Sequence, residues 1–248
     1  MLRFFLLLAV AVPAFAQDTA WRVPFITTPD EVVERMLAFA GTRADDLVVD
    51  LGSGDGRIVI TAARKYGSRG LGIELDGKLV QISRENARNA AVADRVEFVQ
   101  GDVLLADFSK ASVVTLYLLP DLISQLQSKF VELQPGTRIV SHSFRMTGWR
   151  PDRSESMKVT GPHVGQGDES TLYLWIVPAN VRGIWMVDGK RVRIDQDYQQ
   201  IDVEGASDAR LSGAEVSWRW PQGAFRGRVL GNRIAGEIAG KPVVLERR

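Results

Sequence analysis

The chain has 248 residues, with 31 lysines and arginines against 30 carboxylates, and it contains no cysteine. The lack of cysteine excludes disulfides, cysteine-ligated zinc and thiol catalysis. A formal net charge of +1 gives no sign of a nucleic-acid partner. This length is enough for one large core, or for one core and a smaller second one.

The N-terminal stretch MLRFFLLLAVAVPAFAQ has the composition of a secretory signal. Arg3 precedes an apolar run over residues 4–12, and an Ala-Phe-Ala cleavage site follows at residues 14–16. We expect cleavage after Ala16 and a periplasmic location, with membrane contact only through this segment, because the run is short for a membrane span. The alternatives are an uncleaved anchor, or a start codon assigned too far upstream, which would leave the protein in the cytoplasm.

Residues 28–31, Thr-Pro-Asp-Glu, predict the start of a helix. Thr28 is expected to accept from free backbone N–H groups, Pro29 fits the first helical position, and Glu31 completes a capping box. An apolar face then recurs at helical spacing as far as Gly41, formed by Val32, Val33, Met36, Leu37 and Ala40.

Strands and helices alternate after this helix. Strands are predicted over residues 47–51, 70–75, 96–100, 112–118 and 138–143, and helices over 57–66, 76–91 and the segment around Leu122 to Phe130. Two further strands are expected over residues 157–160 and 171–177, joined by a long polar loop that contains His163. The pattern indicates an α/β fold with a doubly wound, mostly parallel sheet of seven strands.

No helix is evident after Pro178. The segment GIWMVDGKRVRID predicts a hairpin whose type I′ turn is Asp188-Gly189, and short alternating strands follow it. We therefore divide the chain into a signal peptide (1–16), a cofactor-binding domain (17–178) and a small antiparallel β module (179–248). Trp185, Trp218 and Trp220 are expected in the core of the module. The module is interpreted as a lid or a dimer-stabilising appendage, or else as a part that recruits a protein acceptor or docks to the envelope.

The stretch VVDLGSGDGRIVI, residues 48–60, predicts a cofactor-binding glycine loop between a strand and a helix. A dinucleotide fold needs a small residue where Arg57 stands, and the carboxylates of Asp50 and Asp55 would repel a pyrophosphate. S-adenosylmethionine (SAM) has a cationic amino acid end and no phosphate. The loop of Gly52, Ser53, Gly54 and Gly56, preceded by Asp50, is therefore predicted to bind SAM.

Two further acids lie at the carboxyl ends of the next two strands: Glu74 ends the second strand and Asp102 follows the third. Glu74 is placed to accept from both ribose hydroxyls, and Asp102 to accept from the adenine amino group, with Leu75 and Val103 on either side of the ring. These acids fall at the carboxyl ends of neighbouring parallel strands, where open α/β sheets bind their ligands. The alternative is that they cap helices.

In order and spacing, VVDLGSGDGRIVI, GIELD and VEFVQGDV resemble the class I SAM-dependent methyltransferases, over roughly residues 24–177. This resemblance implies a Rossmann-like fold of seven strands and SAM as the cofactor. PFITTPDEVVERML and TLYLLP are similar to the mitochondrial-type protein-lysine methyltransferases and their bacterial relatives. That similarity implies that residues 24–28, Thr28 included, fold over the cofactor and that residues 117–120 face the methyl group. The export signal and the β module depart from the family, so the similarity supports fold and cofactor more than substrate.

Tyr117 and His142 are the candidate catalytic residues. The Tyr117 ring is expected to contact the acceptor nitrogen, or else to pack as a structural tyrosine. His142, at the end of the fifth strand, positions the acceptor, acts as a base, or is a hydrogen-bonded structural histidine. Trp149 and Arg150 in the following loop are expected to contact the acceptor. No metal is expected, because His142 and His163 have no third ligand at metal spacing.

The expected function is SAM-dependent methyl transfer, with a protein lysine as the acceptor. A lysine acceptor loses its proton to water in an apolar channel, so the reaction needs no dedicated base. Two alternatives stay open: methylation of a small molecule, and a non-catalytic SAM-fold binding module of the cell envelope.

Overall fold

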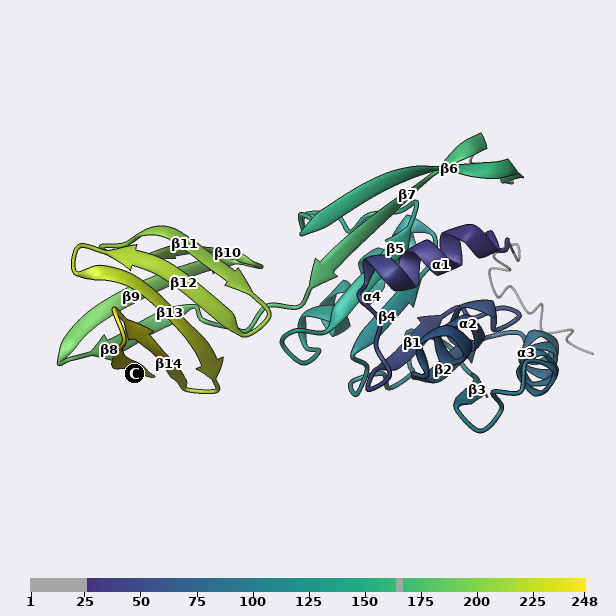
Figure 1. Cartoon of the computed structure of the whole chain (residues 1–248), viewed down its shortest axis with the longest axis horizontal. Helices are drawn as coiled ribbons and strands as arrows, with labels where there is room; N and C mark the ends of the chain where they lie inside the picture. Colours follow the sequence, from purple (N-terminus) through teal and green to yellow (C-terminus); the bar gives the residue numbers. More distant parts are fainter. Residues whose placement is uncertain (1–25, 164–166) are drawn as a thin grey trace, which may run out of the picture.

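The computed structural model describes residues 26–163 and 167–248, which form two β-sheets, with helices packed on the first (Figure 1). The predicted signal segment lies outside the described residues, and so do residues 24–25 of the segment 24–28 that is expected to fold over the cofactor. Across residues 26–163 and 167–248, each helix is too short or too polar to cross a membrane.

The first sheet has seven strands in the order β3-β2-β1-β4-β5-β7-β6. They are β1 (Leu47–Leu51), β2 (Arg69–Glu74), β3 (Val96–Gln100), β4 (Val113–Leu116), β5 (Arg138–His142), β6 (Arg153–His163) and β7 (Gly167–Ile176). β1 to β5 are parallel, and β7 runs antiparallel between β5 and β6. The predicted doubly wound, mostly parallel sheet is therefore confirmed.

Helices cover both faces of this sheet. α1 (Asp30–Phe39), α2 (Arg57–Tyr66) and α3 (Gly77–Asn89) bury their apolar residues against one face, and α4 (Pro120–Val131) buries its own against the other. The bounds of α2 agree with the prediction, and Asp76 caps α3 by accepting from the backbone N–H of Lys78 at 2.8 Å. β1 is buried between the two helical layers, as its apolar sequence predicts.

The predicted capping box at the start of α1 is wrong. Pro29 occupies the N-cap position, and no side chain caps this helix. The Thr28 hydroxyl instead lies 3.4 Å from Nδ1 of His142, and the Glu31 carboxylate accepts from the backbone N–H of Thr160. Both side chains therefore bond to distant segments, so tertiary contacts override the local motif.

The hairpin of β6 and β7 extends beyond the end of β5. His142, the last residue of β5, pairs with Leu172, and β7 reaches back past this level to Gly167 beside β6 (Figure 1). The predicted strands were too short, because β6 at the sheet edge and the start of β7 beyond β5 are polar and lack the apolar alternation that marks a buried strand. The backbone of His163 ends β6, and is not in a loop as predicted, while its side chain is outside what the structure describes.

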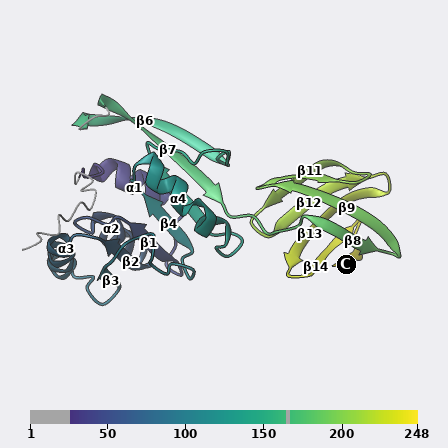
Figure 2. The same cartoon turned by 180° about the vertical axis from the view of Figure 1, so that it is seen from behind.

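Eight antiparallel strands form the second sheet, in the order β10-β9-β8-β15-β14-β13-β12-β11. They are β8 (Gly183–Val187), β9 (Lys190–Asp197), β10 (Gln200–Val203), β11 (Ser207–Ser212), β12 (Glu215–Trp220), β13 (Gly223–Leu230), β14 (Arg233–Ile238) and β15 (Lys241–Arg247). β10 and β11 also lie close together, so the sheet curls nearly into a barrel (Figure 2). We call this sheet the β module.

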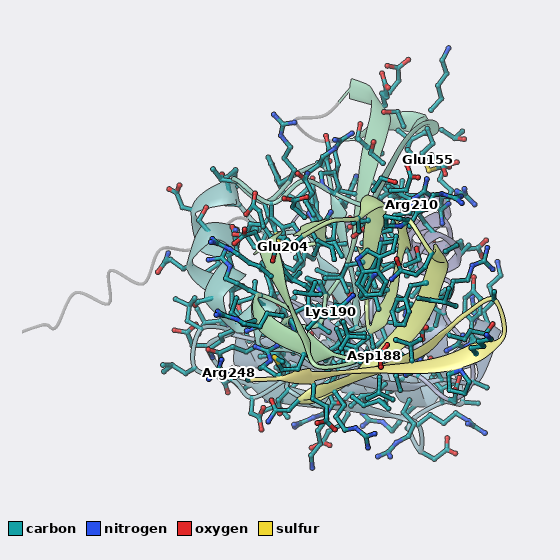
Figure 3. The ribbon with its side chains drawn as sticks, turned by 90° about the vertical axis from the view of Figure 1, so that its left-hand side faces the viewer. Glu155, Asp188, Lys190, Glu204, Arg210 and Arg248 are labelled. Atoms are coloured by element: carbon teal, nitrogen blue, oxygen red, sulfur yellow. The ribbon has the colours of Figure 1, made fainter. Side chains whose placement is uncertain are left out.

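The β module follows its sequence pattern closely. Asp188 and Gly189 both have positive φ, 48° and 74°, which confirms the type I′ turn between β8 and β9. The three tryptophans, Trp185, Trp218 and Trp220, are buried inside the curled sheet, as predicted. Its charged side chains, such as Asp188, Lys190 and Arg210, lie at the outer surface when the molecule is viewed from the module end (Figure 3).

Candidate functional site

The glycine loop turns sharply between β1 and α2, at the carboxyl edge of the first sheet. Gly52 and Gly56 have φ of +79° and +82°, in the left-handed region that favours glycine. A Cβ at Gly52 would come within 2.8 Å of the Leu118 side chain, and one at Gly56 within 2.6 Å of the Phe98 ring. The backbone conformation therefore favours glycine at both positions, and at Gly56 close packing against the Phe98 ring requires it as well.

The backbone N–H groups of this loop donate within the protein. The bonds are Gly52 and Ser53 to the Ile73 carbonyl at 2.9 and 3.0 Å, Gly54 to the Glu74 carboxylate at 2.8 Å, and Gly56 to the Ser53 carbonyl at 2.9 Å. Loops that hold a pyrophosphate direct such groups at the ligand instead. The loop therefore does not present these donors to a dinucleotide, which agrees with a phosphate-free cofactor.

Glu74 connects the glycine loop to the start of α3. One carboxylate oxygen accepts from the N–H of Gly54 at 2.8 Å, and the other accepts from the N–H of Asp76 at 2.9 Å. Each oxygen keeps a second lone pair that can accept from a ligand hydroxyl. The carboxylate is thus held at the carboxyl end of β2, where the ribose of SAM is predicted to bind.

Asp50 is a buried acid at the centre of the site. Its side chain accepts from the Thr115 hydroxyl at 2.6 Å, and the residue is 3% exposed. Burial raises the pKa of Asp50 to about 7, and the nearby carboxylates of Glu74 and Asp55 act in the same direction. A cationic group bound here would stabilise the ionised form, so the site fits the ammonium end of SAM.

We expect the stability of the ligand-free chain to fall as the pH rises from about 4 to about 7, since Asp50 keeps a proton there that the unfolded chain releases. The shift corresponds to at most about 4 kcal/mol. Asp50→Asn keeps an acceptor for Thr115 but does not titrate, so its stability is expected to fall less over this range. Urea unfolding at pH 5 and pH 8 measures the difference, and equal pH dependence in both proteins would contradict the expectation.

The other predicted cofactor residues lie at the same edge. Asp102 is exposed, and its carboxylate accepts from the N–H of Leu104 at 2.9 Å, so it also stabilises the turn after β3. Leu75 is 57% exposed beside Glu74, whereas Val103 is only 7% exposed and packs mostly into the core. The Ser53 hydroxyl lies over Gly72 of β2, and among the described residues it has no hydrogen-bond partner.

The carboxylate of Asp55 in the glycine loop forms an ion pair. The guanidinium of Arg57 pairs with it at 2.6 Å, and the same side chain donates to the carbonyl of Thr28 at 2.9 Å. Arg57 therefore offsets the negative charge of Asp55 and ties the segment before α1 to the glycine loop. Thr28 is 4% exposed, so this segment is packed against the site.

The two candidate catalytic residues are in contact with each other. The ring centroids of Tyr117 and His142 lie 4.3 Å apart, with 32° between the ring planes. His142 is fully buried, and its Nε2 lies 3.0 Å from the Ser170 hydroxyl of β7. Tyr117 is half-buried, and burial raises the pKa of its hydroxyl, which therefore stays protonated and able to donate.

The predicted acceptor contact of Trp149 is wrong. This residue is 1% exposed, and its indole stacks on Tyr198 of the β module with centroids 4.7 Å apart and planes at 9°. Its Nε1 donates to the Gln199 side chain at 2.9 Å, and the carbonyl of Arg150 accepts from the same side chain. Both residues therefore form the junction with the β module. The junction also places Gly213 against Gly136, which precedes β5 at the amino edge of the sheet, opposite the glycine loop.

Sequence reasoning missed several residues that shape the site. The Thr115 hydroxyl on the neighbouring strand donates to Asp50, and the Ser170 hydroxyl lies within hydrogen-bond distance of His142. The Phe98 ring packs against Gly56 of the glycine loop. Only Phe98 left a signal in the sequence. Gly72 lies opposite it on β2 and would place a Cβ 2.5 Å from its ring, so a glycine inside a strand marks this close approach.

Comparison with known proteins places this geometry in a family. The model of the ANTKMT methyltransferase domain matches residues 50–153. A protein-lysine N-methyltransferase of Saccharolobus islandicus is 39% identical over 157 residues, which are 62% of this chain and 94% of that protein. A solved structure described as an RNA methyltransferase from Salinibacter ruber, in complex with S-adenosylhomocysteine, is 49% identical with a TM-score of 0.57. The match covers 96% of that protein and 63% of this chain.

A mouse relative is matched over less of its length. The adenine nucleotide translocase lysine N-methyltransferase of Mus musculus is 34% identical over 132 residues, which are 52% of this chain and 57% of that protein. The chain therefore spans little more than half the length of this relative. The Saccharolobus islandicus protein, in contrast, is matched over 94% of its length.

Proposed function

Because this chain belongs to the class I SAM-dependent methyltransferases of the ANTKMT type, we propose that its methyl acceptor is the side-chain amine of a lysine in a protein. The family assigns methyl transfer from SAM, while the choice of acceptor is inferred from the site. The names of the Saccharolobus islandicus and mouse relatives support a lysine acceptor. The name of the Salinibacter ruber structure makes RNA the second candidate.

The proposal of a lysine acceptor depends on the charge of exposed side chains at the carboxyl edge of the first sheet, where the glycine loop lies. Exposed carboxylates follow β2, β3 and β4 or begin α1, namely Asp76, Asp102, Asp121 and Asp30, and they outnumber the exposed cations Lys78, in the first turn of α3, and Arg145, after β5. The guanidinium of Arg57 is already paired with Asp55. An acidic edge attracts a cationic lysine and repels the phosphates of RNA, so this edge favours a lysine acceptor.

Bound SAM supplies a methyl group on a sulfonium, which is already a good leaving group. The chain then has to bind the cofactor and align the acceptor. We propose that Asp50, Glu74 and Asp102 hold the cofactor, together with Leu75, Val103 and the loop of Gly52, Ser53, Gly54 and Gly56. On the acceptor side, the half-buried Tyr117 offers a ring face and a protonated hydroxyl to the lysine nitrogen. Thr28 closes the site beside the glycine loop through Arg57.

Labelled methyl transfer tests this function. The purified chain is incubated with methyl-labelled SAM and a cell extract that includes the envelope fraction, and label is measured in protein, RNA and small molecules. We expect label in protein, recovered as methyl-lysine after hydrolysis. Glu74→Ala is expected to abolish the label, and Glu97→Ala, an exposed glutamate on the neighbouring β3, to keep it. Label in RNA or in the small-molecule fraction alone would contradict the lysine proposal.

We propose further that residues 1–16 direct export and are removed after Ala16. The support is the basic residue, apolar run and Ala-Phe-Ala site of this segment. Cell fractionation with N-terminal sequencing of the recovered chain tests it. A mature N-terminus at Gln17 in the periplasmic fraction is expected, and an intact Met1 in the cytoplasm would contradict it.

A further inference from the structure

We propose that His142 is a positioning residue, which fixes the Tyr117 ring and the Thr28 segment on the acceptor side of the site. This inference rests on the proposed function only in assigning Tyr117 to the acceptor. Of the roles that the sequence leaves open for His142, it favours the hydrogen-bonded structural one over that of a general base. Three segments that are far apart in the sequence, those of Thr28, Tyr117 and Ser170, meet at its imidazole.

The imidazole of His142 is completely buried. Its Nδ1 lies 3.4 Å from the Thr28 hydroxyl before α1, and its Nε2 lies 3.0 Å from the Ser170 hydroxyl of β7. One face of the ring packs against Tyr117 after β4. A general base needs a nitrogen within reach of the acceptor proton. Both nitrogens of His142 lie beside buried hydroxyls of the protein instead, which makes the residue a structural support.

The contacts of His142 connect the cofactor side to the acceptor side. Thr28, which bonds the imidazole through its hydroxyl, also accepts from Arg57 through its carbonyl at 2.9 Å. Arg57 is paired with Asp55 in the glycine loop. Ser170, on the other nitrogen, belongs to the part of β7 that extends beyond β5. The imidazole thus joins the glycine loop and the β6–β7 hairpin through side-chain bonds.

Tyr117 is held on the side of the site next to the loop. Its neighbour Leu118 packs on Gly52, and the ring centroids of His142 and Phe144 lie 4.3 and 6.3 Å from the centroid of the Tyr117 ring. An aromatic face attracts a cation only when the ring is held in the right orientation. Removing the bonds of His142 is therefore expected to weaken the contact between Tyr117 and an amine, and to leave the glycine loop intact.

Two cofactor analogues separate these effects. S-adenosylhomocysteine lacks the methyl group and reports on the cofactor site alone. Sinefungin carries an amine in place of the transferable methyl group, so it also reports on the surface that the acceptor nitrogen meets. The ratio of their dissociation constants, measured by calorimetry, needs no acceptor, so the result does not depend on whether lysine is the acceptor.

We expect His142→Phe, which keeps a ring but removes both hydrogen bonds, to weaken sinefungin by about tenfold and S-adenosylhomocysteine by less than about twofold. Thr28→Val and Ser170→Ala are expected to shift the ratio in the same direction by a smaller factor. They carry the test if His142→Phe does not fold. Tyr117→Leu is expected to reproduce the full effect.

Thr137→Val is the matched control. Thr137 is 3% exposed, and its hydroxyl donates to the Ala111 carbonyl at 3.1 Å near the amino edge. This variant removes a buried hydroxyl, as Thr28→Val does, and is expected to lower the melting temperature without changing the ratio. An unchanged ratio in folded Thr28→Val and Ser170→Ala, or an equal change in Thr137→Val, would overturn the proposal.

Discussion

Replacing Glu74 with alanine is expected to weaken SAM binding by about 100- to 1,000-fold. The change removes the acceptor for the N–H groups of Gly54 and Asp76, as well as the acceptor proposed for the ribose. Hydrogen bonds to a charged group contribute about 1.5–3 kcal/mol each. Losing the two bonds proposed between this carboxylate and the ribose hydroxyls therefore accounts for an effect of this size. Calorimetric titration of the purified chain with SAM measures it.

Glu97→Ala is the control for this prediction. Glu97 is an exposed glutamate and the second residue of β3, so the change removes the same type of side chain from the neighbouring strand and leaves the loop contacts intact. SAM affinity of this variant is expected to stay within about twofold of the original, in line with the small effects of surface substitutions. A Glu74→Ala protein that binds SAM within threefold of the original would show that this carboxylate does not hold the cofactor.

Trp149→Ala is expected to destabilise the chain by about 3–5 kcal/mol, the range for a buried tryptophan replaced by alanine. The residue is 1% exposed and stacks on Tyr198, so its removal leaves a cavity where the two sheets meet. Urea unfolding followed by circular dichroism measures the loss. SAM affinity is expected to be unchanged, because this junction lies opposite the glycine loop.

Tyr198→Phe separates the stacking from the hydrogen bond. The Tyr198 hydroxyl accepts from the Gln127 side chain at 2.8 Å, and phenylalanine keeps the ring but removes this bond. A smaller loss of stability, about 1 kcal/mol, is expected for this variant.

If Trp149→Ala weakened SAM binding by as many kcal/mol as it lowers stability, the separation of the junction from the cofactor site would be wrong.

The sequence predicts the parts of the site that depend on local geometry. The glycine loop lies between a strand and a helix whose bounds agree with the prediction, because Gly52 and Gly56 need a left-handed backbone and the buried strand is continuously apolar. Glu74 ends β2 and Asp102 follows the adjacent parallel strand β3, so the topology alone brings them to one edge.

The contacts that went unpredicted are those made between distant segments. Thr28 carries the local signal of a helix cap, yet its hydroxyl bonds His142, 114 residues away. Trp149 lies in a loop where an acceptor contact is plausible from the topology, but the aromatic partner that buries it belongs to the other sheet. Neither partner has a fixed spacing to these residues, so no local pattern indicates them.

The attachment of the β module has a consequence for how the enzyme is oriented. The module meets the first sheet at its amino edge, through Trp149 and Tyr198, while the glycine loop proposed to hold the methyl donor lies at the opposite, carboxyl edge. A molecule that binds the module therefore holds the enzyme at the amino edge of its first sheet, and the proposed cofactor site faces away from that molecule. An enzyme tethered in this way would modify molecules that approach from the surrounding medium, and would leave its own anchoring surface unmodified.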